Sequence, residues 1–373
     1  MSRDDNAGLY VHVPFCRTKC LYCDFYSVTS PVLLRPWLQA VRKEALFYRD
    51  KWALFDSLYL GGGTPSLLDE SALHHLMDHV LRVFRFSSDA EMTMEMNPDD
   101  VTPHRMQMLR DFGFNRISLG VQSLQDEELA WLGRRHTAEQ AENAIRMIRC
   151  TGFKNLGVDL IYGLPGQDRA TWLRTLQRIL LHKPEHLSCY MLTLEDRTPL
   201  GRMRAEGKFI QVGESDQIRL FLLTSRFLEE HGYIHYEVSN FARDAVSASR
   251  HNQKYWNHTP YLGLGPAAHS FRDGVRWWNV SSVEDYCMRI IRGEKPVEGS
   301  EILNGEQLQL EAVYLGLRTK RGFNIALLEK NTQTGTALNR LIRSGYLEVR
   351  DNRVIPTRRG YLVADRLPME ILS

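Results

Sequence analysis

Three cysteines lie within eight residues near the amino end of the chain, in VPFCRTKCLYCDFYS (residues 13–27). Cys16, Cys20 and Cys23 have the spacing C-x-x-x-C-x-x-C and are half of the six cysteines in the sequence. An odd number of thiols argues against disulfides, and a structural zinc site normally has four ligands, often as two C-x-x-C pairs. A single catalytic thiol would not explain three. Three thiolates fit a [4Fe-4S] cluster, which would leave one iron open to bind another molecule.

The composition restricts the class of protein that carries this motif. At 373 residues the chain is long enough for one large domain and an appendage. Its 47 basic and 45 acidic side chains give a net charge of +2, too balanced for a nucleic-acid binder held mainly by phosphate contacts. The start, MSRDDNAG, lacks the apolar core of a secretory signal, and no uncharged apolar run could span a bilayer. We therefore expect a cytoplasmic protein, where thiols stay reduced.

The order of strands and helices indicates how the cysteines are positioned. Short β-rich runs alternate with longer stretches in which Leu, Met and Ile recur at helical spacing, which predicts βαβ units and a parallel sheet. Strands are expected at 9–13, 57–63, 90–96, 116–122, 156–163 and 186–192, and helices at 32–49, 70–84, 103–112, 137–149 and 168–182. Six such units predict an α/β fold, a partial (β/α)6 barrel of the TIM type. The cysteines follow its first strand, on the side where such barrels hold active sites.

The expected strands also alternate apolar and polar side chains. In the third strand Met92, Met94 and Met96 share one face, opposite Thr93 and Glu95. The apolar face suits an outer layer of helices, which leaves the polar side chains inside the barrel. Because a barrel interior is normally packed with branched apolar side chains, a polar interior predicts a bound polar ligand. The alternative is a solvated sheet face.

A glycine run ends the second expected strand, in YLGGGTPSLL (59–68). No Gly-Lys-Ser/Thr follows it, so it is not a phosphate-binding P-loop. On its own such a Gly-Pro cluster indicates only a turn. Here it follows a strand and three cysteines, and glycine lets backbone N–H and C=O groups approach a ligand closely. We therefore expect this turn to line a ligand site.

The cysteine spacing resembles the signature of the radical S-adenosylmethionine (radical SAM) superfamily over about the first 240 residues. The resemblance implies that the open iron binds the amino and carboxylate groups of S-adenosylmethionine (AdoMet), which an electron cleaves to a 5′-deoxyadenosyl radical. Further motifs narrow the resemblance to the coproporphyrinogen III dehydrogenase-like family and, within it, to the HemW-type heme chaperones. These motifs are YVHVPFC, GGGTPS, EMNP, RISLGVQS, LGRRHT, VDLIYGLPGQ, HNQKYW and GLGPAAHS.

The resemblance implies that eight residues, identified by their position in these motifs, contact AdoMet. They are Tyr10, Gly62, Gly63, Thr64, Glu95, Gln122, Arg134 and Asp159. The chemistry of these side chains agrees with that role. The planar guanidinium of Arg134 can bind a carboxylate. Glu95, Gln122 and Asp159 can accept hydrogen bonds from ribose hydroxyls or an amino group. Without the resemblance, LGRRHT would be interpreted as a solvated basic turn.

One departure from the family pattern bears on function. The dehydrogenase carries a fourth cysteine two residues after the third, whereas this sequence has Phe25 there, as the heme-chaperone branch does. The resemblance therefore implies a chaperone that binds heme and hands it to acceptor proteins. An oxygen-independent coproporphyrinogen III dehydrogenase is the alternative, so whether the chain is an enzyme stays open. A homodimer and peripheral contact with membrane-bound acceptors are compatible with the resemblance.

Candidate heme ligands lie in two later motifs. HNQKYW contains His251, and GLGPAAHSF contains His269. A neutral imidazole is a common axial ligand of heme iron, and the resemblance points first to His251 and more weakly to His269. The alternative is that both are hydrogen-bonded structural histidines. GLGPAA also loosely matches a dinucleotide fingerprint, but we expect no strand before it and no β-α unit around it.

The character of the sequence changes after residue 300. LQLEAVYLGLRT (308–319) predicts an amphipathic helix, and the segments that follow resemble a winged-helix layout. Six arginines make this region basic: Arg340, Arg343, Arg350, Arg353, Arg358 and Arg359. We interpret them as a solvated face of a lid or partner-docking domain, with no nucleic acid as partner. Three parts are therefore expected: a radical SAM partial barrel (1–240), an extension with the HNxxYW motif (241–300) and an α-rich, winged-helix-like domain (301–373).

Overall fold

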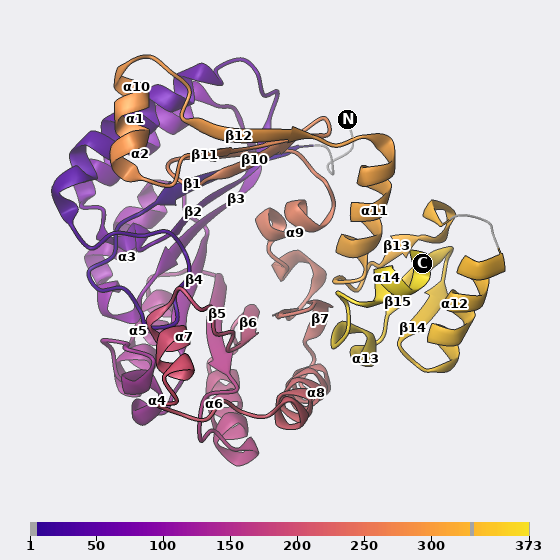
Figure 1. The fold of residues 1–373 in the computed structure, drawn as a ribbon. Helices are drawn as coiled ribbons and strands as arrows, with labels where there is room; N and C mark the ends of the chain where they lie inside the picture. Colours follow the sequence, from indigo (N-terminus) through magenta and orange to yellow (C-terminus); the bar gives the residue numbers. More distant parts are fainter. Residues whose placement is uncertain (1–5, 329–331, 373) are drawn as a thin grey trace.

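The computed structural model describes residues 6–328 and 332–372, so MSRDD, the first five residues of the stretch MSRDDNAG, lies outside the described residues. Six parallel strands pair with one another in sequence order, and helices cover their outer face (Figure 1). The strands are β1 (Ala7–Val13), β2 (Phe55–Gly62), β3 (Phe86–Met96), β4 (Arg116–Gln122), β5 (Asn155–Tyr162) and β6 (His186–Met191). The helices are α1 (Leu34–Phe47), α2 (Glu70–Val83), α3 (Pro103–Asp111), α4 (Asp126–Trp131), α5 (Ala138–Cys150) and α6 (Arg169–Leu181). The predicted partial (β/α)6 barrel is confirmed.

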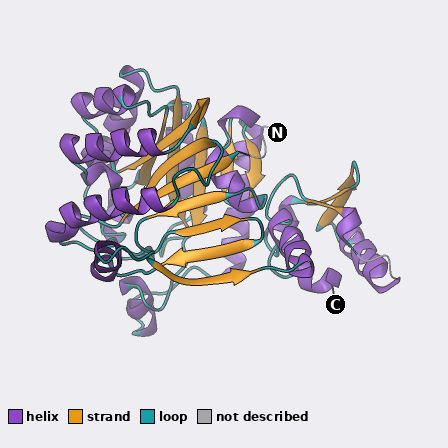
Figure 2. Cartoon of the chain, turned by 90° about the horizontal axis from the view of Figure 1, so that it is seen from above, coloured by secondary structure: helices purple, strands orange, loops and turns teal. Residues whose placement is uncertain are grey.

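The main apolar core lies between the sheet and the helix layer. Leu9, Val11 and Met94 point outward from their strands and are buried there together with Leu73 and Leu76 of α2. Figure 2 shows the helices gathered along one side of the curved sheet. The outward face is therefore the apolar one, as the alternation in the sequence predicted, and the polar side chains of the same strands face the barrel interior.

Both edges of the parallel sheet are extended by later strands into a sheet of twelve. At one edge β9 pairs parallel to β1, followed by β10, β11 and β12; at the other, β8 pairs with β6 and β7 with β8. These strands are β7 (Ile234–Glu237), β8 (Asn240–Ala242), β9 (Tyr261–Leu264), β10 (His269–Arg272), β11 (Val275–Asn279) and β12 (Val297–Ile302). The expectation that no strand precedes the glycines of GLGPAA is therefore wrong, because residues 261–264 pair with β1. A strand follows β9, so no β-α unit surrounds the motif.

Four helices connect the outer strands. They are α7 (Pro199–Ala205), α8 (Glu214–Glu230), α9 (Arg250–Trp256) and α10 (Val283–Ile291). The short α9 packs against β1 and β2 and lies on the open side of the barrel (Figure 1). In the described part of the chain, no helix combines the length and apolarity that crossing a membrane requires.

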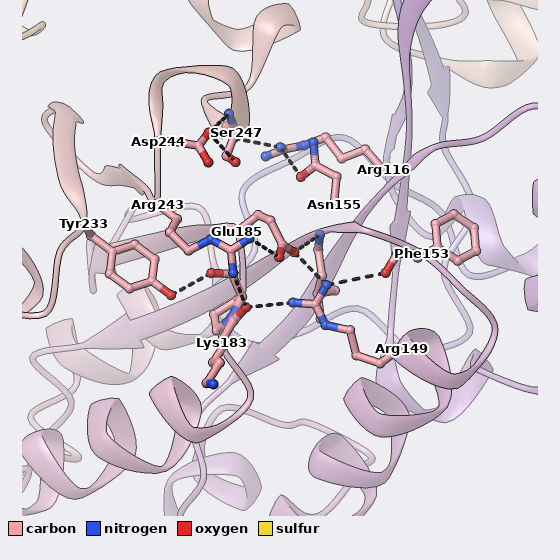
Figure 3. A network of polar contacts seen from close by, with 12 residues as sticks. Arg116, Arg149, Phe153, Asn155, Lys183, Glu185, Tyr233, Arg243, Asp244 and Ser247 are labelled. Carbon is pink, nitrogen blue, oxygen red and sulfur yellow. Dashed lines mark hydrogen bonds and ion pairs between the residues drawn. The ribbon is translucent and has the colours of Figure 1, made fainter.

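Charged side chains hold the barrel together where β6 meets the antiparallel strand β8 (Figure 3). Glu185 accepts from Arg149 of α5 at 2.7 Å and pairs with Arg243 at 2.9 Å, and it also accepts the backbone N–H of Leu156 at 3.0 Å. Because the carboxylate is buried, breaking this network would leave an unpaired charge inside the protein. The network therefore fixes the edge at which the parallel sheet ends.

The carboxyl-terminal part forms a separate unit with its own apolar core, which includes Phe323, Leu341, Leu347 and Val354. A three-stranded sheet in the order β13-β15-β14 packs with the helices. The elements are α11 (Gly305–Gly316), β13 (Phe323–Asn324), α12 (Thr332–Arg343), β14 (Leu347–Arg350), β15 (Arg353–Pro356), α13 (Arg358–Tyr361) and α14 (Leu367–Leu372). This order is the predicted winged-helix-like layout.

Several of the basic residues of this unit bind within the protein. Arg340 pairs with Glu370 at 3.0 Å and Arg350 with Glu348 at 3.3 Å, while Arg353 donates to backbone carbonyls. Such contacts fit the interpretation of these arginines as structural and solvated groups.

Candidate functional site

A cavity of about 580 Å³ opens at the carboxyl ends of the parallel strands and extends into the barrel. Its wall includes all the predicted cluster and AdoMet residues except Tyr10: Cys16, Cys20, Cys23, Gly62, Gly63, Thr64, Glu95, Gln122, Arg134 and Asp159. These residues come from β2, β3, β4, β5 and three loops, so only the closed sheet brings them together. His251 and His269, the predicted heme ligands, are not among the lining residues.

The cysteines lie on a loop that is tied closed at its base. Phe15 and Val28 form an isolated bridge, and Cys16 N–H donates to Val28 O at 2.9 Å. The loop is also held from α7 and the residues before it. Leu200 N–H of α7 donates to Leu21 O at 3.0 Å, and Arg197, just before α7, forms a bidentate ion pair with Asp24. The three thiols are thus presented from one loop at one end of the cavity.

The surroundings of the thiols fit thiolate ligands. Thr64 Oγ1 donates to Cys16 Sγ at 3.5 Å, and Arg134 Nη1 donates to Cys20 Sγ at 3.3 Å. Burial raises the pKa of Cys23 to about 11, so binding metal at this position must displace a proton. The described residues contain no group of three His, Cys, Asp or Glu arranged around a single metal ion. A cubane binds each thiolate at a separate iron, and three free cysteines around one cavity fit that demand.

The glycine turn after β2 packs tightly against the end of β1. Gly63 N–H donates to Val13 O at 2.8 Å and Thr64 N–H to Phe15 O at 2.7 Å. Gly62 has a φ of 106°, and a Cβ there would lie 2.4 Å from the ring of His12. The turn therefore requires glycine for its backbone conformation and for close packing on β1.

Glu95 lies deep in the cavity and is held by two donors. Tyr59 Oη donates to Oε1 at 2.7 Å, and Gly62 N–H donates to Oε2 at 3.1 Å. Burial raises the pKa of Glu95 to about 7, although the hydrogen bond from Tyr59 opposes this shift. A carboxylate oriented in this way can accept from an amino group or a ribose hydroxyl.

Asp159 and Gln122 complete this polar wall. Ser118 Oγ donates to Asp159 Oδ2 at 3.0 Å, and burial raises the pKa of the carboxyl group. Gln122 has a φ of 67°, and the pairing of β4 with β5 is irregular between Gly120 and Gln122. This irregularity lets Gln122 line the cavity at the strand end.

Arg134 joins the cysteine loop to the strands. Besides Cys20, its guanidinium donates from Nη2 to Asn97 Oδ1 at 2.5 Å and to Gly120 O at 2.8 Å. Its Nε is buried with no partner in the described structure. A planar cation beside the thiols, with unused donor capacity, fits a carboxylate bound next to the cluster.

Further cavity residues escaped the sequence analysis. Arg116, only 2% exposed, and His186 line the deep end with Ser188 and Asn252. Arg116 Nε and His186 Nδ1 have no partner in the described structure. Ser188 lies on the polar face of its strand, as Glu95 does, so the alternation of the sixth strand could have indicated it. Arg116 is the first residue of its strand and Asn252 lies on α9. The alternation within a single strand could therefore not have assigned these two residues to the same cavity.

Tyr10 lies behind this wall. Its Oη is 3.0 Å from His12 Nδ1, and its ring lies 6.2 Å from the rings of Tyr59 and His251. The predicted contact between Tyr10 and AdoMet stays a prediction.

The two predicted heme ligands lie in different surroundings. His251 is buried, with Nδ1 3.0 Å from Ser57 Oγ and Nε2 2.9 Å from Tyr255 Oη. Ligation of heme by His251 would therefore require one of these contacts to break. His269 is exposed on β10, where its ring stacks on Trp278 at 6.0 Å. Both heme assignments stay predictions.

Comparison with known proteins gives the family. Residues 10–179 match the family model of the Radical SAM superfamily. In the structural comparison, coproporphyrinogen III oxidase (HemN) from Escherichia coli, described as a radical SAM enzyme, has a TM-score of 0.85 and 23% identity, over 99% of this chain and 90% of that chain. This likeness shows the fold.

Curated relatives carry a more specific name. The heme chaperone HemW of Mycobacterium tuberculosis (strain H37Rv) is 34% identical over 372 residues, which cover 98% of this chain and 95% of the relative. HemW of Bacillus subtilis is also 34% identical, over 84% of this chain and 83% of the relative. The mitochondrial radical S-adenosyl methionine domain-containing protein 1 of Danio rerio is 37% identical over 70% of this chain and 60% of the relative. Since the M. tuberculosis match extends over almost the whole of both proteins, this chain belongs to the HemW family within the radical SAM superfamily.

Proposed function

We propose that this protein is a heme chaperone, which binds heme and transfers it to acceptor proteins, built on a radical SAM scaffold. The observation that carries the proposal is Phe25, which is 68% exposed on the cavity wall at the position where the dehydrogenase has a further cysteine. An exposed aromatic ring beside the cluster loop suits contact with a flat apolar macrocycle. The curated HemW relatives, which carry the name heme chaperone, support the same function.

The residues of the cavity fit a [4Fe-4S] cluster and AdoMet. Cys16, Cys20 and Cys23 would hold the cluster, which when bound supplies an electron for cleavage of AdoMet. Arg134 would bind the methionyl carboxylate, while Glu95 and Asp159 would accept from the amino and ribose groups. These carboxylates are held by Tyr59 and Ser118, so the site is oriented before the ligand arrives.

We propose that the protein is located in the cytoplasm. We also propose that its acceptors are proteins that use heme. All six cysteines are free, which suits a reducing compartment. A homodimer and contact with membrane-bound acceptors stay predictions that sizing and vesicle flotation of the reconstituted protein can test.

Anaerobic heme titration tests the proposed function. The protein with its cluster should bind heme with a saturable Soret band and pass it to an apo-hemoprotein, and it should leave coproporphyrinogen III unchanged. Stoichiometric formation of protoporphyrinogen in the presence of AdoMet would instead assign the chain to the dehydrogenase alternative.

The cluster needs its own control. Replacing Cys16, Cys20 and Cys23 together by alanine should abolish iron–sulfur absorption and leave the far-UV circular dichroism unchanged, because the loop is held by backbone contacts and by α7. Iron–sulfur absorption that survives the triple substitution would refute the ligand assignment.

A further inference from the structure

The helix α9, which carries the HNQKYW motif, is anchored to three strands by buried polar groups. Glu91 of β3 accepts the backbone N–H of Arg250 and of His251, each at 3.0 Å. Lys254 pairs with Asp56 of β2 at 2.7 Å, and both side chains are buried. A Cβ at Gly8 of β1 would lie 2.7 Å from Lys254 Cδ, so the helix rests directly on the strand. Little freedom remains for α9 to move independently of β1, β2 and β3.

His251 projects from α9 into a layer of aromatic rings. Its ring stacks on Tyr59 at 5.2 Å with an interplanar angle of 28° and meets Tyr255 edge-on at 5.4 Å. Burial lowers the pKa of His251 to about 3, so the imidazole is neutral. One ring nitrogen therefore donates and the other accepts, and Ser57 and Tyr255 occupy both. These contacts fix the orientation of the ring.

Tyr59 connects this layer to the cavity. Burial keeps the pKa of its phenol well above the usual value, so the hydroxyl retains its proton and donates to Glu95 Oε1. The other oxygen of Glu95 accepts from Gly62 N–H, in the glycine turn. The path from α9 to the cavity thus consists of one ring stack and one hydrogen bond.

We propose that His251 is a positioning residue of the AdoMet site, which acts by holding Tyr59 against Glu95. This inference rests on the proposed role of Glu95 as an AdoMet contact. Loss of the imidazole removes the neighbour on which the Tyr59 ring stacks. The phenol then gains freedom, and Glu95 loses the donor that orients it. AdoMet binding weakens although His251 itself does not line the cavity.

The proposal competes with heme ligation by the same residue. An axial ligand must offer a free ring nitrogen, but both nitrogens of His251 are engaged inside the protein. His75, which is exposed on α2 and outside the cavity wall, provides a control histidine that is assigned to no site.

The test measures AdoMet affinity by equilibrium dialysis against the anaerobically reconstituted protein, with the iron content of each variant determined. His251→Ala should weaken binding about tenfold at unchanged iron content, since one oriented hydrogen bond is at stake. Tyr59→Phe should weaken it similarly, and adding His251→Ala to Tyr59→Phe should change little more. His75→Ala should bind AdoMet like the wild type. If His251→Ala does not fold, Ser57→Ala removes the Nδ1 partner with less loss of packing and should weaken binding in the same direction.

The possible results separate the inference from the function on which it rests. A wild-type protein that fails to bind AdoMet refutes the proposed site. If Glu95→Gln abolishes AdoMet binding but His251→Ala leaves it unchanged, only the positioning role is refuted. The same conclusion follows if the effects of His251→Ala and Tyr59→Phe on AdoMet affinity multiply fully in the double variant. A heme titration completes the test: His251→Ala should keep the wild-type Soret band, and its loss at unchanged AdoMet affinity would assign His251 to heme.

Discussion

Phe25 is the residue on which the proposed function depends most. Its backbone follows the third cysteine by two residues, but its side chain is exposed at the cavity wall and adds little to the core. Such a residue contributes little to folding, so its presence is better explained by a ligand that it touches.

Phe25→Ala should therefore separate stability from heme binding. We expect the free energy of unfolding to change by less than about 0.5 kcal/mol, as for other exposed positions, while heme affinity falls several-fold through loss of aromatic contact. Urea unfolding and Soret titration measure the two quantities. Val246→Ala, at an exposed apolar residue outside the cavity wall, is the control. Equal heme affinities of the Phe25→Ala and wild-type proteins would contradict a role for Phe25 in heme binding.

Single residues were predictable where chemistry and spacing coincide. The cysteines were predicted by count and interval, and Glu95 by its position in the family motifs, while the alternation of its strand agreed with a polar interior. Arg116 and His186 were missed because each is the first residue of its strand, where no alternation precedes it. His251 was named as a candidate, but its partner Ser57 was not, because Ser57 is 194 residues away in sequence.

At the scale of elements, Glu44 links α1 to three other parts of the fold. Tyr286 of α10 donates to Oε2 at 2.5 Å, Gly265 N–H donates to Oε2 at 2.8 Å, and Asn279 of β11 donates to Oε1 at 2.6 Å. The carboxyl group has no exposed surface, and burial raises its pKa to about 7 against these hydrogen bonds. The junction between the helix layer and the added strands is therefore sensitive to protonation.

The unfolding free energy should report this protonation. Between the ordinary glutamate pKa of 4.5 and the raised value of about 7, the folded protein binds more protons than the unfolded chain, so stability falls as pH rises through this range. Glu95 and Glu237 have pKa values raised to about 7 as well, and they act in the same direction as Glu44. Burial lowers the pKa of His12, His136 and His235 to about 4, which acts in the opposite direction below pH 6.5, so the wild-type slope is the sum of both groups. Glu44→Gln should flatten that slope by up to about 1.4 kcal/mol per pH unit.

Urea unfolding at intervals from pH 5 to pH 8 measures the slope. Glu294→Gln, at an exposed glutamate, should leave it unchanged. A slope for Glu44→Gln equal to that of the wild type would show that the carboxyl group titrates at the same pH in both states.

The six barrel strands were predictable as elements, while α9 was not. Each strand combines a local apolar pattern with a helix after it, and the pattern alone locates it to within a few residues. The helix α9 has seven residues, too few for a periodic signal, and its place is fixed by Glu91 and Asp56 on distant strands. For β9, pairing with β1 creates a strand in a glycine-containing stretch that lacks a strong local preference.

At the scale of the whole molecule, the carboxyl-terminal unit covers the open side of the barrel (Figure 1). Val238 N–H donates to Arg318 O at 3.0 Å, and Lys320 N–H donates to Tyr236 O at 2.9 Å, so the chain beside β7 is bound through its backbone. His258, just after α9, lies 2.9 Å from Glu311 of α11. The unit thus supports the same helix that we connect to the AdoMet site.

Tyr361 of α13 allows this docking to be tested with a matched pair of variants. Its ring is buried 4.8 Å from the ring of His235 in β7, and its hydroxyl has no partner in the described structure. Tyr361→Phe keeps the packing and removes a buried unpaired group, so its unfolding free energy should equal or exceed that of the wild type. Tyr361→Ala leaves a cavity at the interface and should cost about 3 kcal/mol.

Hydrogen exchange followed by mass spectrometry locates the effect of that cavity. In Tyr361→Ala, peptides covering residues 234–256 should exchange faster than in the wild type, because undocking exposes β7 and loosens the support of α9. Peptides from α2 and α3 should be unaffected, since these helices pack on the outer face of the sheet, away from α9 (Figure 1). Faster exchange confined to residues 305–372 would instead show that the carboxyl-terminal unit loosens internally and that the barrel strands stay paired without it. The Phe variant should exchange like the wild type throughout, which assigns any change to the packing of the ring and not to the hydroxyl.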